Sequence, residues 1–498
     1  MIAGAVPRRL QQNALAAGLG AIVAAICGVA ASQFGREPFI LIFLVAGLGV
    51  VISRWRLAIY GAMAMSTVSG ILALILPLGE PGRLMPQLMA ALAYLAFALD
   101  CLRRREWPRP RGLAPLATAF LALAWLLNSV NPEQFSLKVV ALGLVSYVYF
   151  IPLMFLGYAL VREAKQARNL VAFLAVISIV VAVVGAVQFV LGPARVQALL
   201  PGFNPFGQGT SNGLSAFRFP STFAAVTQLQ DFLTLASIIL LGACLELTGW
   251  RRALALAGFA GLFFIGIINV SRTYYVTLPA GLFLLGLNLW RRRRNRGAAP
   301  SAARPAALPR RVLQIGLLLA FGSLATVAAI RLAGDIVGPR LATLRPDDPG
   351  FNSDIVSRFT KSAQTLDDLV LSDHGWWHGH GTGTSTPYLF HIDLEPAIVE
   401  AFIPEVVYQA GVLGLAAYAF LYGATFIICR RAILQAPDRA TSTWVCVFSA
   451  YLMLIVIESG LGGEDLVLFP SAMFFWLILG AVIGLRDGLP AGARSTQP

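Results

Sequence analysis

Long apolar stretches of about 20 residues alternate with short polar stretches along almost the whole chain. A hydrocarbon core ~30 Å thick needs a helix of that length, and a helix satisfies its own backbone hydrogen bonds in lipid. We therefore predict an all-α polytopic membrane protein with about 14 transmembrane helices. The predicted spans are 14–32, 38–53, 57–77, 85–101, 113–130, 137–160, 169–191, 228–247, 253–271, 274–290, 312–332, 403–429, 442–459 and 467–485.

Composition and charge agree with this pattern. The chain is 57% hydrophobic and 12% charged, whereas soluble domains are about 25% charged, so a water-soluble fold is excluded. The formal charge is +14. If the N-terminus is cytoplasmic, every cytoplasmic segment carries Arg or Lys, which is the positive-inside rule. The positive charge therefore indicates orientation and no nucleic-acid partner. We expect both termini in the cytoplasm and a first helix that is retained.

Two loops organise the chain. Residues 1–332 form a predicted transmembrane bundle, interrupted by a basic cytoplasmic linker at 291–311 that is rich in Arg, Ala and Pro. Residues 333–402 form one large external loop, and 403–498 form the C-terminal transmembrane helices. Within the external loop, the apolar positions of 353–372 have helical spacing and predict an amphipathic helix. Long loops with their own secondary structure are often functional.

Seven basic residues fall at the external face or just under it, where the positive-inside rule disfavours them: Arg218, Arg272, Arg331, Arg340, Arg345, Arg358 and Lys361. Arg331 caps a span end, and Arg340 and Arg345 have Asp347 and Asp348 beside them, so Arg218, Arg272 and Arg358 are the candidates that remain. Charged groups in or beside spans are rare and usually functional. A guanidinium group matches phosphate oxygens in a bidentate way and keeps its charge. Two interpretations stay open at this point: an anion site for a diphosphate group, and salt bridges inside the protein.

Four segments carry a family resemblance. They are FRFPSTFAAVTQLQDFL at 217–233, SRTYYVTLPAGLFLLG at 271–286, SRFTKSAQTLDDLVLSDHGWWHGHGTGT at 357–384, and EAFIPEVVYQAGVLGLAAYAFLYG at 400–423. Together and in this order they resemble motifs of the O-antigen ligase and Wzy-type polysaccharide polymerase superfamily. The shared features are the Arg-x-x-Ser-Thr-Phe and Ser-Arg starts of two spans, a Gly-x-Gly-x-Gly turn, and a Gly-x-x-Gly pair, here Gly411 and Gly414.

The resemblance implies a fold and a reaction. The fold is GT-C-like, in a bacterial inner membrane, with the active site on the periplasmic face. The expected function is a polymerase that joins undecaprenyl-diphosphate-linked repeat units into O-antigen or exopolysaccharide chains. The alternatives are an O-antigen ligase, a protein O-oligosaccharyltransferase and, from a different class, a lipid-linked oligosaccharide flippase. The implied partners are the lipid-linked glycan donor, a glycan acceptor, membrane lipids and a chain-length regulator protein.

Carried onto this chain, the resemblance makes Arg218 and Arg358 the catalytic, diphosphate-contacting arginines, with Arg272 as a brace or third contact. The ligases carry a histidine eleven residues before the Gly-x-x-Gly pair, and here that position is Glu400. His391 stands nine residues further upstream, so an insertion of that length would restore it. Glu400 is our first candidate for the general base and His391 the second, with Glu405 and Asp231 as weaker ones. The alternative interpretation of Glu400 is that it forms an ion pair with one of the arginines.

Aromatic and histidine side chains surround the predicted glycine turn. Trp376, Trp377 and Tyr388 are candidate sugar contacts, although aromatics are also ordinary interfacial anchors in membrane proteins. Four histidines cluster nearby: His374, His378, His380 and His391. A Gly-rich loop without thiols gives them no rigid ligand scaffold, so we expect no metal and no cofactor.

Overall fold

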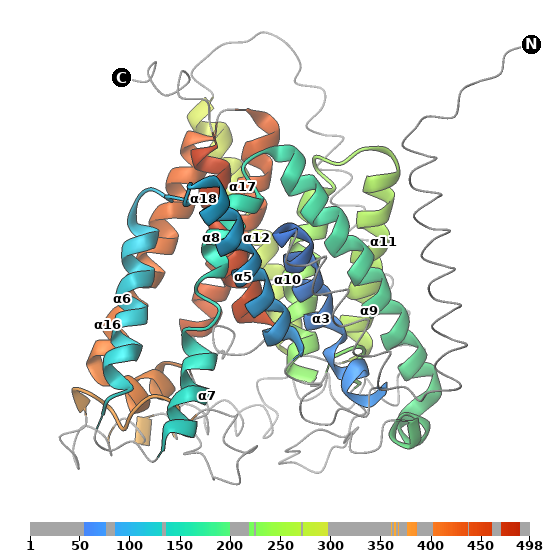
Figure 1. The fold of residues 1–498 in the computed structure, drawn as a ribbon. Coiled ribbons are helices and arrows are strands. Elements are labelled where there is room, and N and C mark those ends of the chain that lie inside the picture. The colour runs from blue at the N-terminus through green and yellow to red at the C-terminus, as the bar shows by residue number, and fades with distance from the viewer. Residues whose placement is uncertain are drawn as a thin grey trace, which may run out of the picture.

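The computed structural model describes residues 54–75, 85–131, 136–199, 219–223, 226–269, 272–296, 360, 363–364, 367, 376–385, 402–436, 438–460 and 470–488. Within these segments the regular elements are helices packed side by side in a bundle (Figure 1). They are α3 (Trp55–Ile75), α5 (Met85–Arg104), α6 (Leu113–Asn128), α7 (Leu137–Tyr147), α8 (Leu153–Leu160), α9 (Ala164–Leu199), α10 (Val226–Ala243), α11 (Gly249–Ile268), α12 (Arg272–Arg296), α16 (Phe402–Gln435), α17 (Arg439–Gly460) and α18 (Ser471–Asp487).

Every predicted span within the described segments consists mainly of helix, so the all-helical class is confirmed there. Five of these helices are long and apolar enough to cross a membrane: α9, α10, α11, α16 and α17. The predicted spans 14–32, 38–53 and 312–332 lie outside the described residues, as does most of the external loop. In the predicted amphipathic helix at 353–372, the described residues 360, 363–364 and 367 are helical and exposed. The total of fourteen spans and the domain boundaries stay predictions.

The prediction of one continuous span over 137–160 is wrong. Helix α7 ends at Tyr147 and α8 begins at Leu153, with turns between them. Pro152 explains the break, because proline has no N–H to donate and its ring clashes with the preceding helical turn. The break is bonded to α5, where the Tyr94 hydroxyl donates to the carbonyl of Tyr149 at 2.9 Å.

Helices α8 and α18 touch through their backbones. Gly480 and Gly484 of α18 and its C-cap Gly488 recur every fourth residue, which is the small-residue spacing of closely packed membrane helices. A Cβ on Gly480 would lie 2.0 Å from the carbonyl oxygen of Met154, and one on Gly484 would lie 2.4 Å from that of Val161. These glycines therefore let α18 run through the middle of the bundle, with almost all of its side chains buried.

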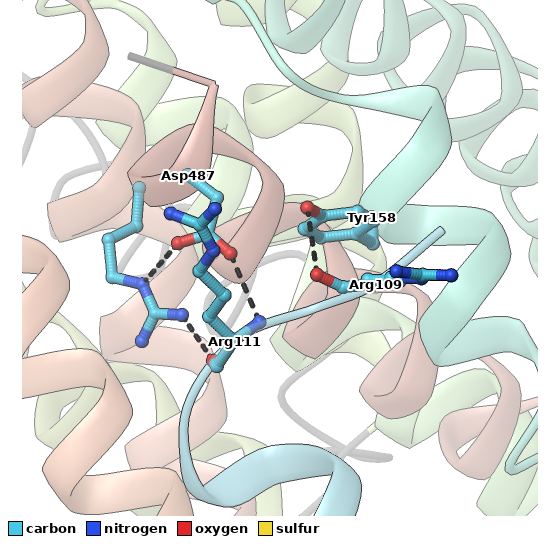
Figure 2. Close-up of polar contacts among 5 residues, drawn as sticks. Arg109, Arg111, Tyr158 and Asp487 are labelled. Atoms are coloured by element: carbon cyan, nitrogen blue, oxygen red, sulfur yellow. Dashed lines mark hydrogen bonds and ion pairs between the residues drawn. The ribbon is translucent and has the colours of Figure 1, made fainter. Parts of the chain in front are cut away.

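Basic residues gather at one end of the bundle, which we call the basic end. There the loop between α5 and α6 is bonded to the last turn of α18 (Figure 2). The Arg486 guanidinium donates to Asp487 at 2.9 Å and also to the carbonyl of Arg111, whose own N–H donates to Asp487 at 3.2 Å. Arg292 of α12 bonds to the carbonyl of Arg439 at 3.2 Å. The opposite end holds the start of α7, low in Figure 1, and the start of α16.

Candidate functional site

Residues 376–385 form a turn at the end opposite the basic end, and we call it the glycine turn. Gly379, Gly381 and Gly383 have φ values of 65°, 106° and 96°, which glycine adopts at little cost. The turn also approaches its neighbours very closely. A Cβ on Gly383 would lie 2.2 Å from the carbonyl oxygen of Val139 in α7. Glycine is therefore required in this motif for two reasons: the positive φ values and the close packing of the turn against α7.

A kink in α16 receives the glycine turn. Gly411 interrupts the helix with φ 59° and ψ −157°. In a continuous helix the carbonyls of Tyr408 and Gln409 would accept from residues four positions later. Here they accept from the turn instead, from His380 N at 2.8 Å and Gly381 N at 2.9 Å. The kink and the turn thus satisfy each other's backbone groups.

Gln409 is the centre of a buried polar network beneath the turn. Its Oε1 accepts from Gly383 N at 2.7 Å, and its Nε2 lies 2.6 Å from Ser385 Oγ and 3.1 Å from Glu405 Oε1. The Tyr147 hydroxyl donates to the same Glu405 oxygen at 2.6 Å. Glu405 is 2% exposed. Its bonds are those of a structural carboxylate, so the weak candidacy of Glu405 as general base is not supported by its position.

The end of α6 holds the other side of the glycine turn. Asn131 Nδ2 donates to the carbonyl of Gly379 at 2.8 Å and lies 3.3 Å from His378 Nδ1. The Thr382 hydroxyl donates to the carbonyl of Trp125 at 3.1 Å. Together with the contacts above, these bonds fix the turn to α6, α7 and α16.

Two tryptophans stand at the start of this rigid turn. Trp376 and Trp377 are 36% and 60% exposed, and their ring centroids are 4.2 Å apart at an interplanar angle of 33°. Both were predicted as sugar contacts, and the structure leaves both accessible. Tyr388, the third predicted contact, lies outside the described residues. A pair of exposed aromatic rings on a fixed backbone is able to stack on a flat apolar face, such as that of a sugar ring.

A second fixed element directly follows Arg218 in the sequence. Residues 219–223 directly follow Arg218 and form a buried, non-helical stretch that we call the anchored segment. The Phe219 N–H donates to Asn269 Oδ1 at 3.3 Å. Asn269 is fully buried at the end of α11 and stands three residues before Arg272. Phe219, which follows Arg218, therefore contacts Asn269, which precedes Arg272 by three residues.

Arg272 is the first residue of α12, at the start of a helix, and its side chain is not among those described. Arg218 and Arg358 lie outside the described residues, as do the base candidates Glu400 and His391. Asp231, the other weak base candidate, accepts a bond of 2.9 Å from the Ser471 hydroxyl at the start of α18. Asp231 therefore links α10 to α18.

The glycine turn and the anchored segment lie at the same end of the bundle. Glu246 follows the last residue of α10 and lies 3.3 Å from Thr443, which is at the basic end. The C-terminus of α10 is therefore at the basic end, and its N-terminus, which follows the anchored segment, is at the opposite end. The last turns of α16 carry Arg430 and Arg431, so its start also points away from the basic end. Both fixed elements are consequently placed opposite the basic residues.

Sequence reasoning did not single out the glutamines and the asparagine that hold these two elements. Gln188, Asn269 and Gln409 are each at most 7% exposed, and each lies in an otherwise apolar run. Buried polar side chains in predicted spans are the signal that would have found them. Among the described residues, no three His, Cys, Asp or Glu side chains come together as metal ligands.

The class that fold and site define is an all-helical, membrane-embedded protein with two rigid elements at one end of its bundle. Comparison with protein-family models gave no match, and comparison with curated proteins gave none either.

Proposed function

We propose that this chain is a membrane-embedded polysaccharide polymerase, which joins undecaprenyl-diphosphate-linked repeat units on the periplasmic face of a bacterial inner membrane. The contact between Phe219 and Asn269 is the observation that carries the proposal, because it joins the segments that contain Arg218 and Arg272. In this proposal the guanidinium groups of Arg218 and Arg272 share one site, and two such groups repel unless an anion lies between them or carboxylates pair with them. A diphosphate group is the anion that fits a membrane-surface site of this kind.

The distribution of charge supports the outer location. By the positive-inside rule the basic end is cytoplasmic, which puts the anchored segment and the glycine turn at the outer surface. Arginines are disfavoured there, so a ligand with negative charge offsets their cost. A lipid-linked diphosphate reaches such a site from the bilayer without crossing it.

The proposed reaction is a glycosyl transfer. A hydroxyl of the acceptor glycan attacks the anomeric carbon of the donor, and a new C–O bond forms there. The bond between that carbon and the diphosphate oxygen breaks, and its electron pair leaves with undecaprenyl diphosphate. Arg218, Arg358 and Arg272 stabilise the charge that develops on the leaving oxygen. Glu400, or else His391, takes the proton from the attacking hydroxyl, which contributes about 10²–10⁴-fold.

The tryptophan pair supports a carbohydrate substrate. Trp376 and Trp377 are exposed on a backbone that Asn131 and Gln409 hold in place. In the proposal they stack on a sugar ring of the glycan. Their alternative role, as anchors at the membrane interface, would leave glycan binding unchanged.

One reconstitution tests the proposal. Purified protein in detergent is incubated with a lipid-linked repeat unit, and glycan length is followed by gel electrophoresis. A polymerase lengthens the glycans even though detergent abolishes compartments, whereas a flippase leaves them at one repeat. Arg218→Ala and Arg358→Ala should each stop elongation while the protein still accumulates normally. Full-length polymer from either variant removes that arginine from the mechanism.

The same assay identifies the base. Glu400→Gln removes a carboxylate with little change of shape, and His391→Ala removes the imidazole. We expect the variant that lacks the true base to lose about 10²–10⁴-fold in turnover while it still binds the donor. If both variants elongate at the normal rate, neither residue is the base.

A further inference from the structure

We propose that His378 is a specificity-determining residue of the glycan site, where its Nε2 accepts a hydrogen bond from a hydroxyl of the sugar that stacks on Trp376 and Trp377. This inference rests on the proposed function, since it assumes that the tryptophan pair binds carbohydrate. Stacked rings recognise the face of a ligand, and a few polar groups beside them fix its orientation. His378 supplies such a group directly after the pair in the sequence.

The imidazole of His378 is fixed through one of its two nitrogens. Its Nδ1 lies 2.8 Å from the carbonyl oxygen of Gly379. A carbonyl oxygen can only accept, so the ring proton is on Nδ1, and Nδ1 donates to Gly379. In the neutral ring Nε2 then carries a lone pair and no proton. The bond to Gly379 therefore selects the tautomer in which Nε2 is a hydrogen-bond acceptor.

The end of α6 holds the same carbonyl in place. Asn131 Nδ2 also donates to the Gly379 oxygen at 2.8 Å, which explains why this amide lies only 3.3 Å from His378 Nδ1. The two donors converge on one acceptor that has two lone pairs. Asn131 and Gly379 are buried, whereas His378 is exposed. The bonded edge of the imidazole therefore faces the protein, and the edge with Nε2 is the accessible one.

The peptide that joins Trp377 to His378 is packed against the kink in α16. A Cβ on Gly411 would lie 2.4 Å from the carbonyl oxygen of Trp377 and 2.7 Å from the N of His378. The backbone of α16 thus touches this peptide directly, with no side chain between them. Trp376, Trp377 and His378 are three consecutive exposed residues on this fixed stretch. Two flat apolar rings and one acceptor are consequently presented side by side.

A carbohydrate has both features that this surface recognises. One face of a sugar ring is flat and apolar enough to stack on an aromatic ring, and its rim carries hydroxyl groups that donate hydrogen bonds. Stacking tolerates many sugars. An acceptor held at one place beside the stack favours a sugar with a hydroxyl there, and disfavours an analogue that lacks it.

Two substitutions separate ligand binding from support of the glycine turn. An asparagine amide is able to place a donor near the position of Nδ1, and a glutamine amide is able to place an acceptor near the position of Nε2. His378→Asn therefore keeps the bond to Gly379 and loses the acceptor, whereas His378→Gln loses that bond and keeps an acceptor. The probe is the free oligosaccharide released from the lipid-linked repeat unit. Its Kd for the purified full-length protein in detergent is measured by calorimetry, with thermal unfolding alongside.

We expect His378→Asn to weaken oligosaccharide binding about three- to tenfold, the range of one hydrogen bond between neutral groups, with an unchanged unfolding temperature. His378→Gln should bind within about twofold of the unsubstituted protein. The opposite order, with normal binding by His378→Asn and a lower unfolding temperature in His378→Gln, assigns the imidazole to the support of the turn and overturns the inference. Binding that is weakened equally in both variants or in neither, or no binding by the unsubstituted protein, also overturns it.

The elongation assay keeps this inference separate from the proposed function. Oligosaccharide binding in the expected order without elongation of the lipid-linked repeat unit supports the His378 contact and ends the proposed polymerase. Elongation by a protein whose two His378 variants bind the oligosaccharide equally well supports the polymerase and removes His378 from the glycan site.

Discussion

The hydroxyl of Tyr147 donates a 2.6 Å hydrogen bond to Oε1 of Glu405, across 258 positions of the chain. Both residues are buried, and Gln409 bonds to the same carboxylate oxygen while it holds the glycine turn. The bond joins α7 to the start of α16 directly under that turn. It shows that the polar groups beneath the predicted glycine motif act first as its support.

Tyr147→Phe should therefore destabilise the folded protein. The ring still stacks on Trp125, whose centroid lies 3.8 Å away, but the buried carboxylate loses one donor. We expect a loss of about 1–3 kcal/mol in the free energy of unfolding, measured by denaturant titration in detergent. Tyr158→Phe is the control, because the Tyr158 hydroxyl makes a 3.4 Å bond to a loop carbonyl at the basic end, and we expect about 0.5 kcal/mol or less there. If both variants lose the same free energy of unfolding, the hydrogen bond to Glu405 contributes no more to stability than the control bond does.

Gly480→Ala tests the backbone contact between α8 and α18. Its Cβ would lie 2.0 Å from the carbonyl oxygen of Met154, so the helices must separate. We expect a loss of about 1–3 kcal/mol, the usual cost of overpacking. Gly423→Ala in α16 is the matched control, because a Cβ there meets nothing within 4 Å and alanine is the better helix former. Thermal unfolding should move down for Gly480→Ala and stay level or rise for Gly423→Ala, and the reverse order would contradict the packing described.

Asp438 should make stability depend on pH at the start of α17. Partial burial raises the pKa of its carboxyl, but bonds from Thr441 N at 2.8 Å and from the Thr441 hydroxyl at 2.7 Å outweigh this and lower the pKa below its ordinary value of 3.8. A lowered pKa gives stability that is present above pH 3.8 and is lost as the pH falls through the folded-state pKa. Asp438→Asn keeps a capping oxygen and should remove this acid dependence, while Asp438→Ala should cost about 1 kcal/mol at neutral pH. Unfolding curves between pH 3 and 7 would show both effects, and unchanged acid sensitivity in Asp438→Asn would refute the assignment.

Trp376→Ala and Trp377→Ala separate a glycan contact from a membrane anchor. If the pair stacks on sugar, each variant should raise the KM for the lipid-linked repeat unit by roughly 3- to 10-fold, the range of one aromatic contact, with the unfolding temperature unchanged. Trp250→Ala is the control, because Trp250 is a 69% exposed tryptophan at the basic end and should leave the KM alone. A lower yield in membranes with a normal KM would instead assign the pair to anchoring.

The helices were predictable because apolar periodicity is a local property. Pro152 was visible in the sequence and marks where the predicted span 137–160 divides. The spacing of Gly480, Gly484 and Gly488 was equally visible, but the sequence does not say which helix it packs against. Local patterns decide which residues form a helix, and the pairing of distant helices is decided by packing.

In the candidate site too, local features could be predicted from the sequence and long-range contacts could not. The glycines of the turn were selected through the family resemblance, and the arginines from residue type and topology. The partner of the turn could not be predicted, because the Asn128 bond to the Gln409 carbonyl joins residues 281 positions apart. Nor could the contact of Phe219 with Asn269, which depends on how α9 and α11 pack around the anchored segment.

The kink at Gly411 also bears on how the proposed lipid-linked substrate would enter. The carbonyls of Tyr408 and Gln409 accept N–H groups from the glycine turn, so pulling the turn away would uncover polar backbone in a setting with little water to compensate. We therefore expect the glycine turn to stay bound to α16 and not to open as a mobile loop. In the polymerase proposed above, a movement that admits the polymer would leave these two backbone hydrogen bonds intact.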